Sequence, residues 1–391
     1  MKIKKKILIL GSTGSIGKSS LKVVKNFKNQ IDIICLSSNK NYKILNKQSK
    51  LFNVKNLIIH DIEYYYKAKK YFRKKKIKLF SSISEFLKKN KKKIDLSIIG
   101  ISGLEGLEPT LKLIPVSKNL ASANKESIIC GWKFIEKKLR KYNTSFIPID
   151  SEHFSIWSLL NNDTDQISKI YLTASGGPFL NSHPSILKKK KVKDVVNHPN
   201  WQMGKKISTD SATMMNKVFE VIEASKIFNI DINKIKIIVH PKSLIHAIVV
   251  FKNGLIKILM HDTSMEIPIF NVIFKDEKIN YYNKTEVKFE NLNGINFLKP
   301  NNKKFPYLNI LQKYKINDTF FEVILVTIND ELVRLFLNKK ISFIKMQQLL
   351  MQTINKKKLS KYYDKRPKKI NDIYNIINQV KKYLKENDQI L

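Results

Sequence analysis

Short apolar runs alternate with amphipathic stretches through the first 150 residues of this 391-residue chain. The runs have the length of buried strands, and the stretches between them repeat apolar residues with helical spacing. The runs lie at Ile7–Leu10, Ile31–Leu36, Asn56–Ile59, Ile94–Ile99, Asn119–Ala123 and Ser145–Ile149. This alternation predicts βαβ units and a parallel, doubly wound sheet, so we expect an α/β, Rossmann-like domain over residues 1–150.

The pattern changes after residue 150. Residues 151–285 mix helical stretches with longer alternating strands, which predicts an α+β domain with a second sheet. We expect the helices at 154–160 and 213–228, and the strands at 167–173, 235–239, 243–251 and 255–260. Turn-forming residues mark 286–307 as a linker, and helical apolar spacing over 308–391 predicts a small C-terminal helical domain.

The formal net charge of +41 raises the question of a nucleic-acid or anionic-membrane partner. The excess is almost entirely Lys, because Arg occurs only at Arg73, Arg140, Arg334 and Arg366. Arg is the residue that reads guanine and phosphate with paired hydrogen bonds. The lysines are spread through every segment, which is typical of a chain-wide compositional bias. We therefore expect no specific nucleic-acid partner, although weak polyanion binding at low salt fits either interpretation.

Two further compositional features bear on location. The chain has two cysteines, Cys35 and Cys130, both beside apolar runs, which fits buried thiols in a reducing compartment. No uninterrupted apolar segment approaches the roughly 18 to 20 residues that a membrane helix needs. The basic start MKIKKK leads into a short apolar run and then glycines instead of a cleavage site, so we expect no export and a cytoplasmic protein.

The stretch GSTGSIG, residues 11–17, follows the first strand and opens into a helical stretch. Glycines there allow a tight turn and close approach of a pyrophosphate, and the start of a helix favours negative charge. The spacing G-x-x-G-x-x-G is less common than G-x-G-x-x-G, so a structural turn remains the alternative. The second strand ends in Ser37 and Ser38, followed by Asn39, Lys40 and Asn41, where an NAD site expects an acid. This predicts NADPH, with an ordinary polar loop as the alternative.

Acidic residues in two distant stretches are candidate metal ligands. Asp150 and Glu152 follow a strand and share a side if the chain stays extended. Further along, Asn216, Glu220 and Glu223 have the spacing of one helical face. Oxygen ligands without a Cys/His cluster suit Mg²⁺ or Mn²⁺, with Co²⁺ as a further candidate. The alternatives are solvated carboxylates at the strand end and a solvated helix face around Asn216.

Other polar residues have a structural alternative of their own. Ser175 follows a strand and precedes two glycines, a context that suits an oxyanion or phosphate pocket. Ser211 stands just before a predicted helix, where it would act as a cap. The polar segment near 197–207 carries an exposed-looking His198 and Trp201, and an aromatic in such a loop is either a core anchor or the cover of a lid.

Several motifs occur in order along the chain: GSTGSIG (11–17), ANKES (123–127), DSEH (150–153), SGGPF (175–179), HPNWQMGKKIS (198–208), DSATMMNK (210–217) and HPKSLIHAIV (240–249). Together they resemble the 1-deoxy-D-xylulose 5-phosphate reductoisomerase family. The resemblance implies an NADPH- and metal-dependent homodimer. Such an enzyme isomerises a ketose phosphate and reduces the product to 2-C-methyl-D-erythritol 4-phosphate in non-mevalonate isoprenoid synthesis.

Site residues follow from the resemblance motif by motif. The cofactor would contact Thr13, Gly14, Ser15, Ile16, Asn39, Lys40, Asn41, Asn124, Glu126 and Gly204. The metal would bind Asp150, Glu152 and Glu220, which together with Lys125 form the expected catalytic set. The sugar phosphate would contact Lys125, Ser151, Glu152, Ser175, His198, Trp201, Ser211, Asn216, Lys217 and Glu220, with His198 and Trp201 in the lid.

The C-terminal third departs most from the family pattern. Residues 328–331 read Ile-Asn-Asp-Glu in place of an expected Ala-Asn-Glu, so any role there is expected to be structural.

Two rival functions remain. Another Rossmann oxidoreductase would need no carboxylate metal site, and a nucleic-acid-binding protein would show salt-dependent affinity without consuming a cofactor.

Overall fold

The structure is a computed structural model that describes residues 4–160, 166–281, 289–314 and 318–386. It divides into two compact units. The first unit comprises Met1–Asn124, Phe134–Phe154 and Ser264–Thr285, and the second comprises Lys125–Lys133, Ser155–Thr263 and Glu286–Leu391. Helices α6 (Lys125–Tyr142) and α7 (Ser151–Leu160) each have residues in both units. The domain boundaries expected at residues 150, 285 and 307 remain a prediction.

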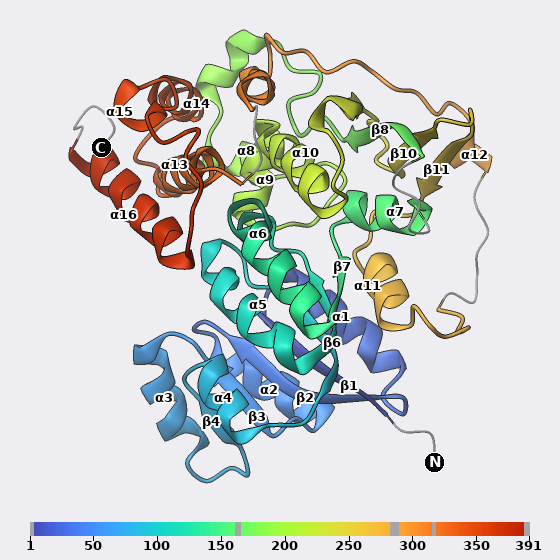
Figure 1. The fold of residues 1–391 in the computed structure, drawn as a ribbon, viewed down its shortest axis with the longest axis vertical. Coiled ribbons are helices and arrows are strands. Elements are labelled where there is room, and N and C mark those ends of the chain that lie inside the picture. The colour runs from blue at the N-terminus through green and yellow to red at the C-terminus, as the bar shows by residue number, and fades with distance from the viewer. Residues whose placement is uncertain (1–3, 161–165, 282–288, 315–317, 387–391) are drawn as a thin grey trace. The chain divides into compact units, whose positions relative to one another are not determined.

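The first unit contains a seven-stranded, wholly parallel sheet in the order β4-β3-β2-β1-β5-β6-β7 (Figure 1). Its strands are β1 (Lys5–Leu10), β2 (Ile31–Ser38), β3 (Asn56–Ile59), β4 (Lys78–Phe80), β5 (Ile94–Ile99), β6 (Ser117–Ser122) and β7 (Ser145–Pro148). Its other helices are α1 (Ser15–Asn26), α2 (Tyr42–Phe52), α3 (Ile62–Phe72), α4 (Ile83–Lys89), α5 (Leu107–Leu113) and α11 (Glu266–Ile273), with short 3₁₀ turns η1 (Leu104–Gly106) and η2 (Ile114–Val116). The predicted doubly wound fold is confirmed.

The strand order reverses direction at β1, which lies between β2 and β5. Residues Ile7–Leu10 have no exposed surface, as expected for a central strand covered on both faces. In a doubly wound sheet the crevice at such a reversal, beyond the carboxyl ends of the strands, is the usual ligand site. Here the glycine stretch follows β1 and Gly100 follows β5. Strand β4 was missed because it is short and buries only Phe80.

The second unit contains a four-stranded sheet in the order β11-β10-β8-β9. Its strands are β8 (Ile167–Ala174), β9 (Ile235–Val239), β10 (Ile245–Phe251) and β11 (Ile256–Met260). Strand β10 is antiparallel to both neighbours, whereas β8 and β9 are parallel. The second predicted sheet is thus confirmed, with strand ends within two residues of those expected.

Helices cover and extend this second sheet. They are α8 (Val192–Val196), α9 (Lys205–Ala212), α10 (Met215–Ile227), α12 (Phe289–Leu292), α13 (Phe320–Leu337), α14 (Phe343–Thr353), α15 (Lys357–Ser360) and α16 (Ile370–Glu386), with 3₁₀ segments η3 (Pro184–Lys189), η4 (Ile232–Lys234) and η5 (Pro306–Lys313). A buried cluster joins Ile156 of α7 and Val221 of α10 to Leu172 and Val249 of the sheet. Helix α13 packs against α14 and α16, which confirms a helical C-terminal region.

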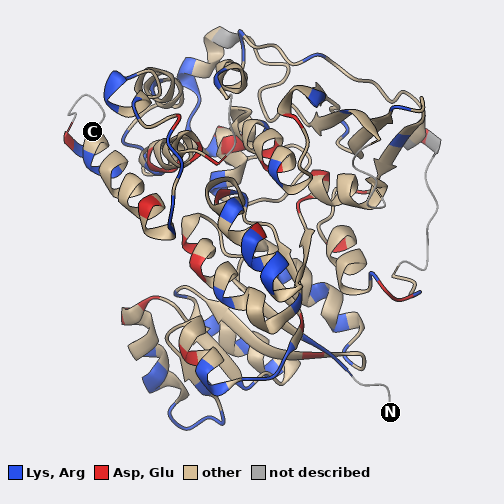
Figure 2. Cartoon of the chain, in the orientation of Figure 1, with Lys and Arg blue, Asp and Glu red and all other residues tan. Residues whose placement is uncertain are grey.

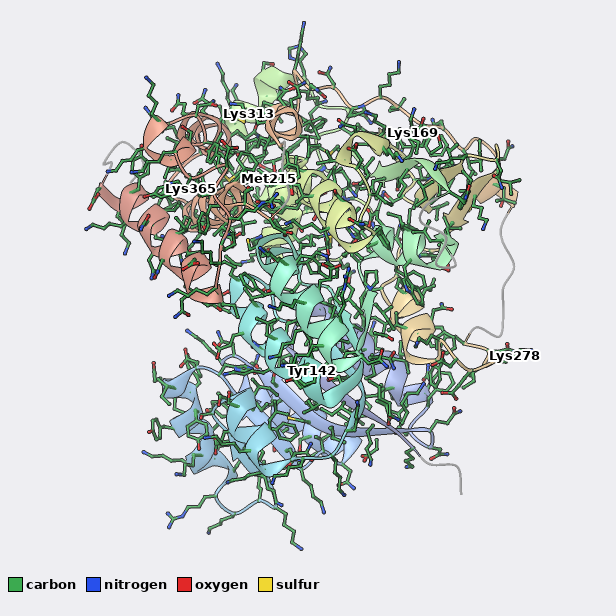
Figure 3. The ribbon with its side chains drawn as sticks, in the orientation of Figure 1. Tyr142, Lys169, Met215, Lys278, Lys313 and Lys365 are labelled. Atoms are coloured by element: carbon green, nitrogen blue, oxygen red, sulfur yellow. The ribbon has the colours of Figure 1, made fainter. Side chains whose placement is uncertain are left out.

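Charged residues are distributed over both units. Figure 2 shows Lys and Arg on helices, strands and loops of each unit, with acidic residues interspersed. Among the side chains labelled in Figure 3, Met215 is buried in α10, whereas Lys313 and Lys365 are exposed. Within the described ranges, no helix combines the length and the apolar character needed to cross a membrane.

Candidate cofactor, metal and substrate sites

The glycine stretch makes the tight turn that its sequence predicts. Gly11 has a φ of +74°, and a Cβ at that position would lie 2.5 Å from the Gly100 carbonyl oxygen. A Cβ on Gly17 would lie 2.3 Å from the Ser12 Cα, so α1 approaches the turn more closely than any other residue allows. Gly14 is the N-cap of α1 and has no side chain to occupy the first amides of the helix. These features favour the phosphate-cradle interpretation over that of a flexible turn.

Hydroxyl groups at the end of β2 fix the turn. The Gly11 amide donates to Ser37 Oγ over 2.9 Å, and Thr13 Oγ1 lies 2.9 Å from Ser38 Oγ. The Asn41 amide also donates to Ser38 Oγ at 3.1 Å. The turn and the loop after β2 therefore form one hydrogen-bonded unit, which brings predicted cofactor residues from both segments together.

The loop after β2 carries less free positive charge than its sequence suggests. Lys40 Nζ lies 3.5 Å from Oδ2 of Asp61, the N-cap of α3, which sequence reasoning did not associate with this site. Asn41 caps α2, because its side chain accepts from the Ile44 amide. Asn39 accepts from the Asp61 amide through its carbonyl. A 2′-phosphate would compete with Asp61 for Lys40.

The other predicted cofactor residues have structural contacts of their own. Asn124 donates through Nδ2 to the carbonyls of Ile101 and Gly103, so it fixes the loop after β5. Glu126 and Gly204 belong to the second unit, where Gly204 is the N-cap of α9. Their contact with a cofactor remains a prediction.

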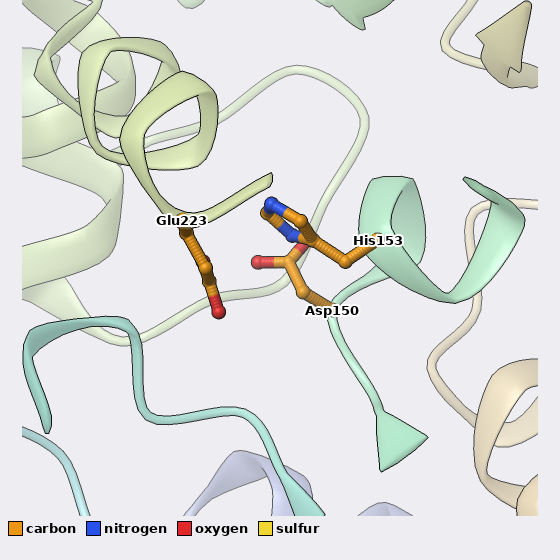
Figure 4. Close-up of side chains that lie close together, drawn as sticks. All are labelled: Asp150, His153 and Glu223. Atoms are coloured by element: carbon orange, nitrogen blue, oxygen red, sulfur yellow. The ribbon is translucent and has the colours of Figure 1, made fainter. Parts of the chain in front are cut away.

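The DSEH segment begins a helix instead of continuing the strand. Helix α7 starts at Ser151, so the chain does not stay extended here, and the condition on which Asp150 and Glu152 were expected to share a side is not met. The carboxylates lie at the N-terminus of this helix, where its dipole favours negative charge. Ser151 Oγ donates to Glu152 Oε2 at 2.5 Å, and Asp150 Oδ1 lies 3.9 Å from Nδ1 of the buried His153. Figure 4 draws Asp150 and His153, together with Glu223 of α10.

The second unit gathers three predicted residues around the carboxylate of a fourth, Glu220. Glu220 is 1% exposed, and its Oε1 lies 3.0 Å from Lys125 Nζ and 2.5 Å from Asn216 Nδ2. Its Oε2 lies 2.5 Å from Lys217 Nζ. Lys217 also donates to the Thr173 carbonyl at 2.8 Å, which connects α10 to the end of β8. Glu220 on this helix face is therefore buried, and Asn216 is partly buried and bonded to it, which disfavours a fully solvated face.

Burial makes this arrangement sensitive to substitution. Removing one partner of a buried charge pair leaves an uncompensated charge, which typically costs about 3–5 kcal/mol. Two ammonium groups and an amide on one carboxylate form a site that already places hydrogen-bond donors side by side. Such donors suit the oxygens of a hydroxylated, phosphorylated molecule.

Ser175 and His198 are brought together, and the hydrogen bonds assign the imidazole tautomer. His198 Nδ1 accepts from the Asn200 and Trp201 amides, at 3.1 and 3.0 Å. Nε2 therefore carries the proton and donates to Ser175 Oγ, 2.9 Å away. His198 is only 9% exposed, so its exposed appearance in the sequence was misleading. Its ring fixes the polar segment internally.

Ser211 does not cap a helix, contrary to the structural interpretation of its sequence position. It lies inside α9, and the N-cap of α10 is Met214 in a left-handed conformation with a φ of +64°. A Cβ on Gly177 would come within 2.9 Å of the Ser211 carbonyl oxygen. The glycines after Ser175 thus allow the loop after β8 to lie directly against α9.

The predicted lid segment is attached to the HPKS segment by a residue that sequence reasoning missed. Asn200 donates through Nδ2 to the Pro241 carbonyl at 2.7 Å and to Ser243 Oγ at 2.8 Å. The Trp201 ring meets His246 edge to face, with ring centroids 5.9 Å apart. The only sequence signal for Asn200 was its position between His198 and Trp201 in a polar loop. Trp201 is partly buried, so its exposure is intermediate between that expected of a core anchor and that expected of a lid cover.

A cluster of charges surrounds Lys206 in α9. Its ammonium lies 2.5 Å from Glu126 Oε1, 3.0 Å from Asp210 Oδ2 and 3.0 Å from Asp330 Oδ1. Burial opposes the charge on Lys206, but the three carboxylates raise its pKa well above the usual value. Burial raises the pKa of Asp330 to about 7, with Lys206 opposing the rise and Glu126 and Asp210 adding to it.

This cluster predicts a pH dependence of stability. An unfolded Asp titrates near about 3.9, so between about pH 4 and about pH 7 the native state holds more protons at Asp330 than the unfolded state does. The contribution of Asp330 to the free energy of unfolding therefore falls as pH rises through this window and is level above it. We expect Asp330→Asn to remove this decline in urea unfolding at about pH 5 and about pH 8. An unchanged difference between the two pH values would contradict the assignment.

Sequence models of known protein families match three segments of the chain. Residues 7–131 match the sequence model of 1-deoxy-D-xylulose 5-phosphate reductoisomerase. Residues 146–228 match the 1-deoxy-D-xylulose 5-phosphate reductoisomerase C-terminal domain, and residues 260–383 match the DXP reductoisomerase C-terminal domain. The 1-deoxy-D-xylulose 5-phosphate reductoisomerase of Pelagibacter ubique is 49% identical over 96% of this chain and 97% of its own. That of Wolbachia pipientis from Culex pipiens is 37% identical over 96% and 94%.

Solved structures agree with the sequence relatives. The reductoisomerase from Zymomonas mobilis in complex with NADPH superposes with a TM-score of 0.84 at 28% identity, covering 97% of both chains. A DOX-P reductoisomerase in complex with NADPH, fosmidomycin and magnesium gives 0.90 at 27% identity, again over 97% of both chains. Sequence and fold thus match over nearly the whole length, and the chain belongs to the 1-deoxy-D-xylulose 5-phosphate reductoisomerase family.

Proposed function

We propose that this chain catalyses the NADPH- and divalent-metal-dependent isomerisation and reduction of 1-deoxy-D-xylulose 5-phosphate to 2-C-methyl-D-erythritol 4-phosphate, a step of non-mevalonate isoprenoid synthesis. The observation that carries the proposal is the gathering of Lys125, Asn216 and Lys217 on the buried Glu220 carboxylate. Lys125, Asn216 and Lys217 each lie in a family motif, and the curated relatives that carry this name align over 96% of the chain.

The first unit fits NADPH. The glycine turn leaves room for a pyrophosphate at the first amides of α1, and a Cβ at Gly17 would remove that room. Thr13, Gly14, Ser15 and Ile16 would hold the pyrophosphate, while Asn39, Lys40 and Asn41 would bind the 2′-phosphate. Bound NADPH supplies the hydride for the reduction.

The donor set fits Mg²⁺ or Mn²⁺, because Asp150, Glu152 and Glu220 offer hard carboxylate oxygens. We assign these three residues as the ligands. A divalent ion bound there supplies Lewis acidity to the carbonyl and the neighbouring hydroxyl of the ketose. A site of this kind separates the proposal from a Rossmann oxidoreductase that transfers hydride alone.

The residues of the chain then act on the sugar phosphate. Lys125 supplies an ammonium that stabilises oxyanions developing while carbon–carbon bonds break and re-form. Ser175, Ser211, Asn216 and Lys217 bind the phosphate and the hydroxyls, and His198 directs its Nε2 proton toward Ser175 Oγ. Binding energy from the phosphate, remote from the reacting carbons, orients the substrate and favours closure of the segment that carries Trp201.

The proposed function is tested by following NADPH absorbance with purified protein and 1-deoxy-D-xylulose 5-phosphate. We expect oxidation that requires Mg²⁺ or Mn²⁺ and stops with EDTA, with 2-C-methyl-D-erythritol 4-phosphate as product. Oxidation that is unaffected by EDTA would favour a metal-free oxidoreductase. No oxidation by folded, NADPH-binding protein would refute the proposal.

Trp201→Ala is expected to lower kcat/KM for the sugar phosphate by on the order of tenfold or more, because the closed segment would lose its aromatic cover. NADPH affinity in the absence of substrate should stay within about twofold. Steady-state kinetics and cofactor fluorescence measure the two effects. An unchanged kcat/KM would return Trp201 to a purely structural role at His246.

We infer further that the protein is a homodimer. Strand β11 is an edge strand of the second sheet. Its Ile256 and Ile258 are 62% and 51% exposed, and Leu255, just before the strand, is 57% exposed. An apolar edge of this kind is normally covered by another chain.

The two free, buried cysteines support a reducing location such as the cytoplasm.

The homodimer is tested by replacing both Ile256 and Ile258 with Lys. The two side chains lie on the same face of β11, so two charges there should convert the dimer to monomer. Light scattering gives the mass, with Leu292→Lys, an exposed apolar residue elsewhere, as the matched control. A dimer that survives the double substitution would place the interface elsewhere.

A further inference from the structure

Helix α13 carries two neighbouring polar residues, Asn329 and Asp330, within a largely apolar sequence. Its sequence is FFEVILVTINDELVRLFL, and Asn329 is only 2% exposed. Asn329 donates through Nδ2 to Asp210 Oδ1 at 2.8 Å. The neighbouring Asp330 lies 3.0 Å from Lys206 Nζ. Both partners belong to α9, so adjacent residues of the C-terminal helix hold two positions of α9 one turn apart.

These contacts connect the C-terminal region to the substrate-binding elements of the same unit. Lys206 and Asp210 also pair with each other within α9, and Lys206 reaches Glu126 of α6, the residue after Lys125. Asp210 directly precedes Ser211. Helix α9 therefore lies between the segment that carries Trp201 and the residues of α10 on Glu220.

A purely packing role does not require this chemistry. Apolar residues of similar volume often stabilise a buried interface as well as a polar network does, because burying charges costs desolvation. A hydrogen bond and an ion pair, in contrast, fix direction and register along a helix. Two directional contacts on successive turns of α9 set both its position and its rotation.

We propose that Asn329 and Asp330 are positioning residues that fix α9. Its position then lets Ser211, and the segment that carries Trp201 and ends at Gly204, contact the phosphate of the substrate. This inference depends on the proposed role of Ser211 in phosphate binding. It assigns a function to the part of the chain for which the sequence predicted only a structural one.

The test compares Asn329→Leu with Glu331→Gln, a control on the same helix. Glu331 lies next to Asp330 in sequence, but its carboxylate pairs with Arg334 and Lys381. We expect Asn329→Leu to raise the KM for 1-deoxy-D-xylulose 5-phosphate by about tenfold, with a smaller change in kcat and NADPH affinity within about twofold. Hydrogen exchange of the 205–212 amides should be faster in this variant. Glu331→Gln should change none of these values.

Asp330→Asn carries the same test if Asn329→Leu does not fold, because it keeps the side-chain volume and removes only the charge. We expect a KM increase of about threefold and faster exchange over 205–212. An unchanged KM in the folded variant would overturn the inference. So would a loss of kcat, KM and NADPH affinity together in proportion to a lower melting temperature, since that is the mark of a structural role.

Failure of the proposed function gives a different result. Wild-type protein would then oxidise no NADPH with this substrate. If Ser211 does not bind the phosphate, Ser211→Ala should leave the KM unchanged. A raised KM in Asn329→Leu together with an unchanged KM in Ser211→Ala would overturn the inference, because Asn329 would then not act through Ser211. A raised KM in both variants, without change in Glu331→Gln, is the predicted outcome.

Discussion

Glu220→Gln is expected to lower kcat by on the order of a thousandfold while leaving NADPH affinity nearly unchanged. The substitution keeps the shape of the side chain but removes the charge that faces Lys125 and Lys217 and that would bind the divalent ion. It also leaves two ammonium groups without their buried partner, so a lower melting temperature should accompany the loss.

Steady-state turnover across a Mn²⁺ titration and cofactor fluorescence measure these effects. Glu108→Gln is the matched control, because Glu108 is an exposed residue that pairs with Lys112 on α5. It should behave as wild type. Near-normal turnover of Glu220→Gln at low metal concentration would refute the assignment of Glu220 as a ligand.

Gly17→Ala is expected to weaken NADPH binding by at least about tenfold, since the new methyl group has no space. Its Cβ would lie 2.3 Å from the Ser12 Cα and 2.5 Å from the Gly11 carbonyl oxygen. These are backbone atoms, so relief requires a shift of α1 away from the turn. The first amides of the helix would then no longer point at the pyrophosphate.

The measurement is NADPH affinity by calorimetry, with Gly254→Ala as control. Gly254 has a φ of +87° but open space around the position of a Cβ, and it lies in a turn of the second unit. That variant should lose some stability, because alanine is strained at a positive φ, but no cofactor affinity. Wild-type NADPH affinity in folded Gly17→Ala would remove the glycine turn from the cofactor site.

The strands were predictable because buried strands appear in the sequence as short, continuous apolar runs. Strand β5 coincides with the predicted run 94–99, and β9 with 235–239, since each apolar run ends where the chain turns to polar or glycine residues. Strand β4 left too short a trace. Helix starts were harder to place, because a helix can begin wherever its first turn finds partners. The start of α7 at Ser151 is an example.

The site was predictable only in part. The spacing of Asn216 and Glu220 anticipated their hydrogen bond, which is local to one helix. The pairing of Lys40 with Asp61, of Asn200 with Ser243 and of Asn329 with Asp210 depends on contacts between distant segments. Local patterns say little about such contacts. The Asn within a largely apolar helical stretch was a signal for the last of them, but it did not identify Asp210 as the partner.

The central claim is that Asp150 and Glu152 share one divalent ion with Glu220. The most direct test is a crystal structure grown with Mn²⁺ and NADPH, with anomalous scattering measured at the manganese edge. We predict one strong anomalous peak bonded to a carboxylate oxygen of each of the three residues. A peak that lacks Glu220, or a manganese ion bound only at other side chains, would contradict the claim.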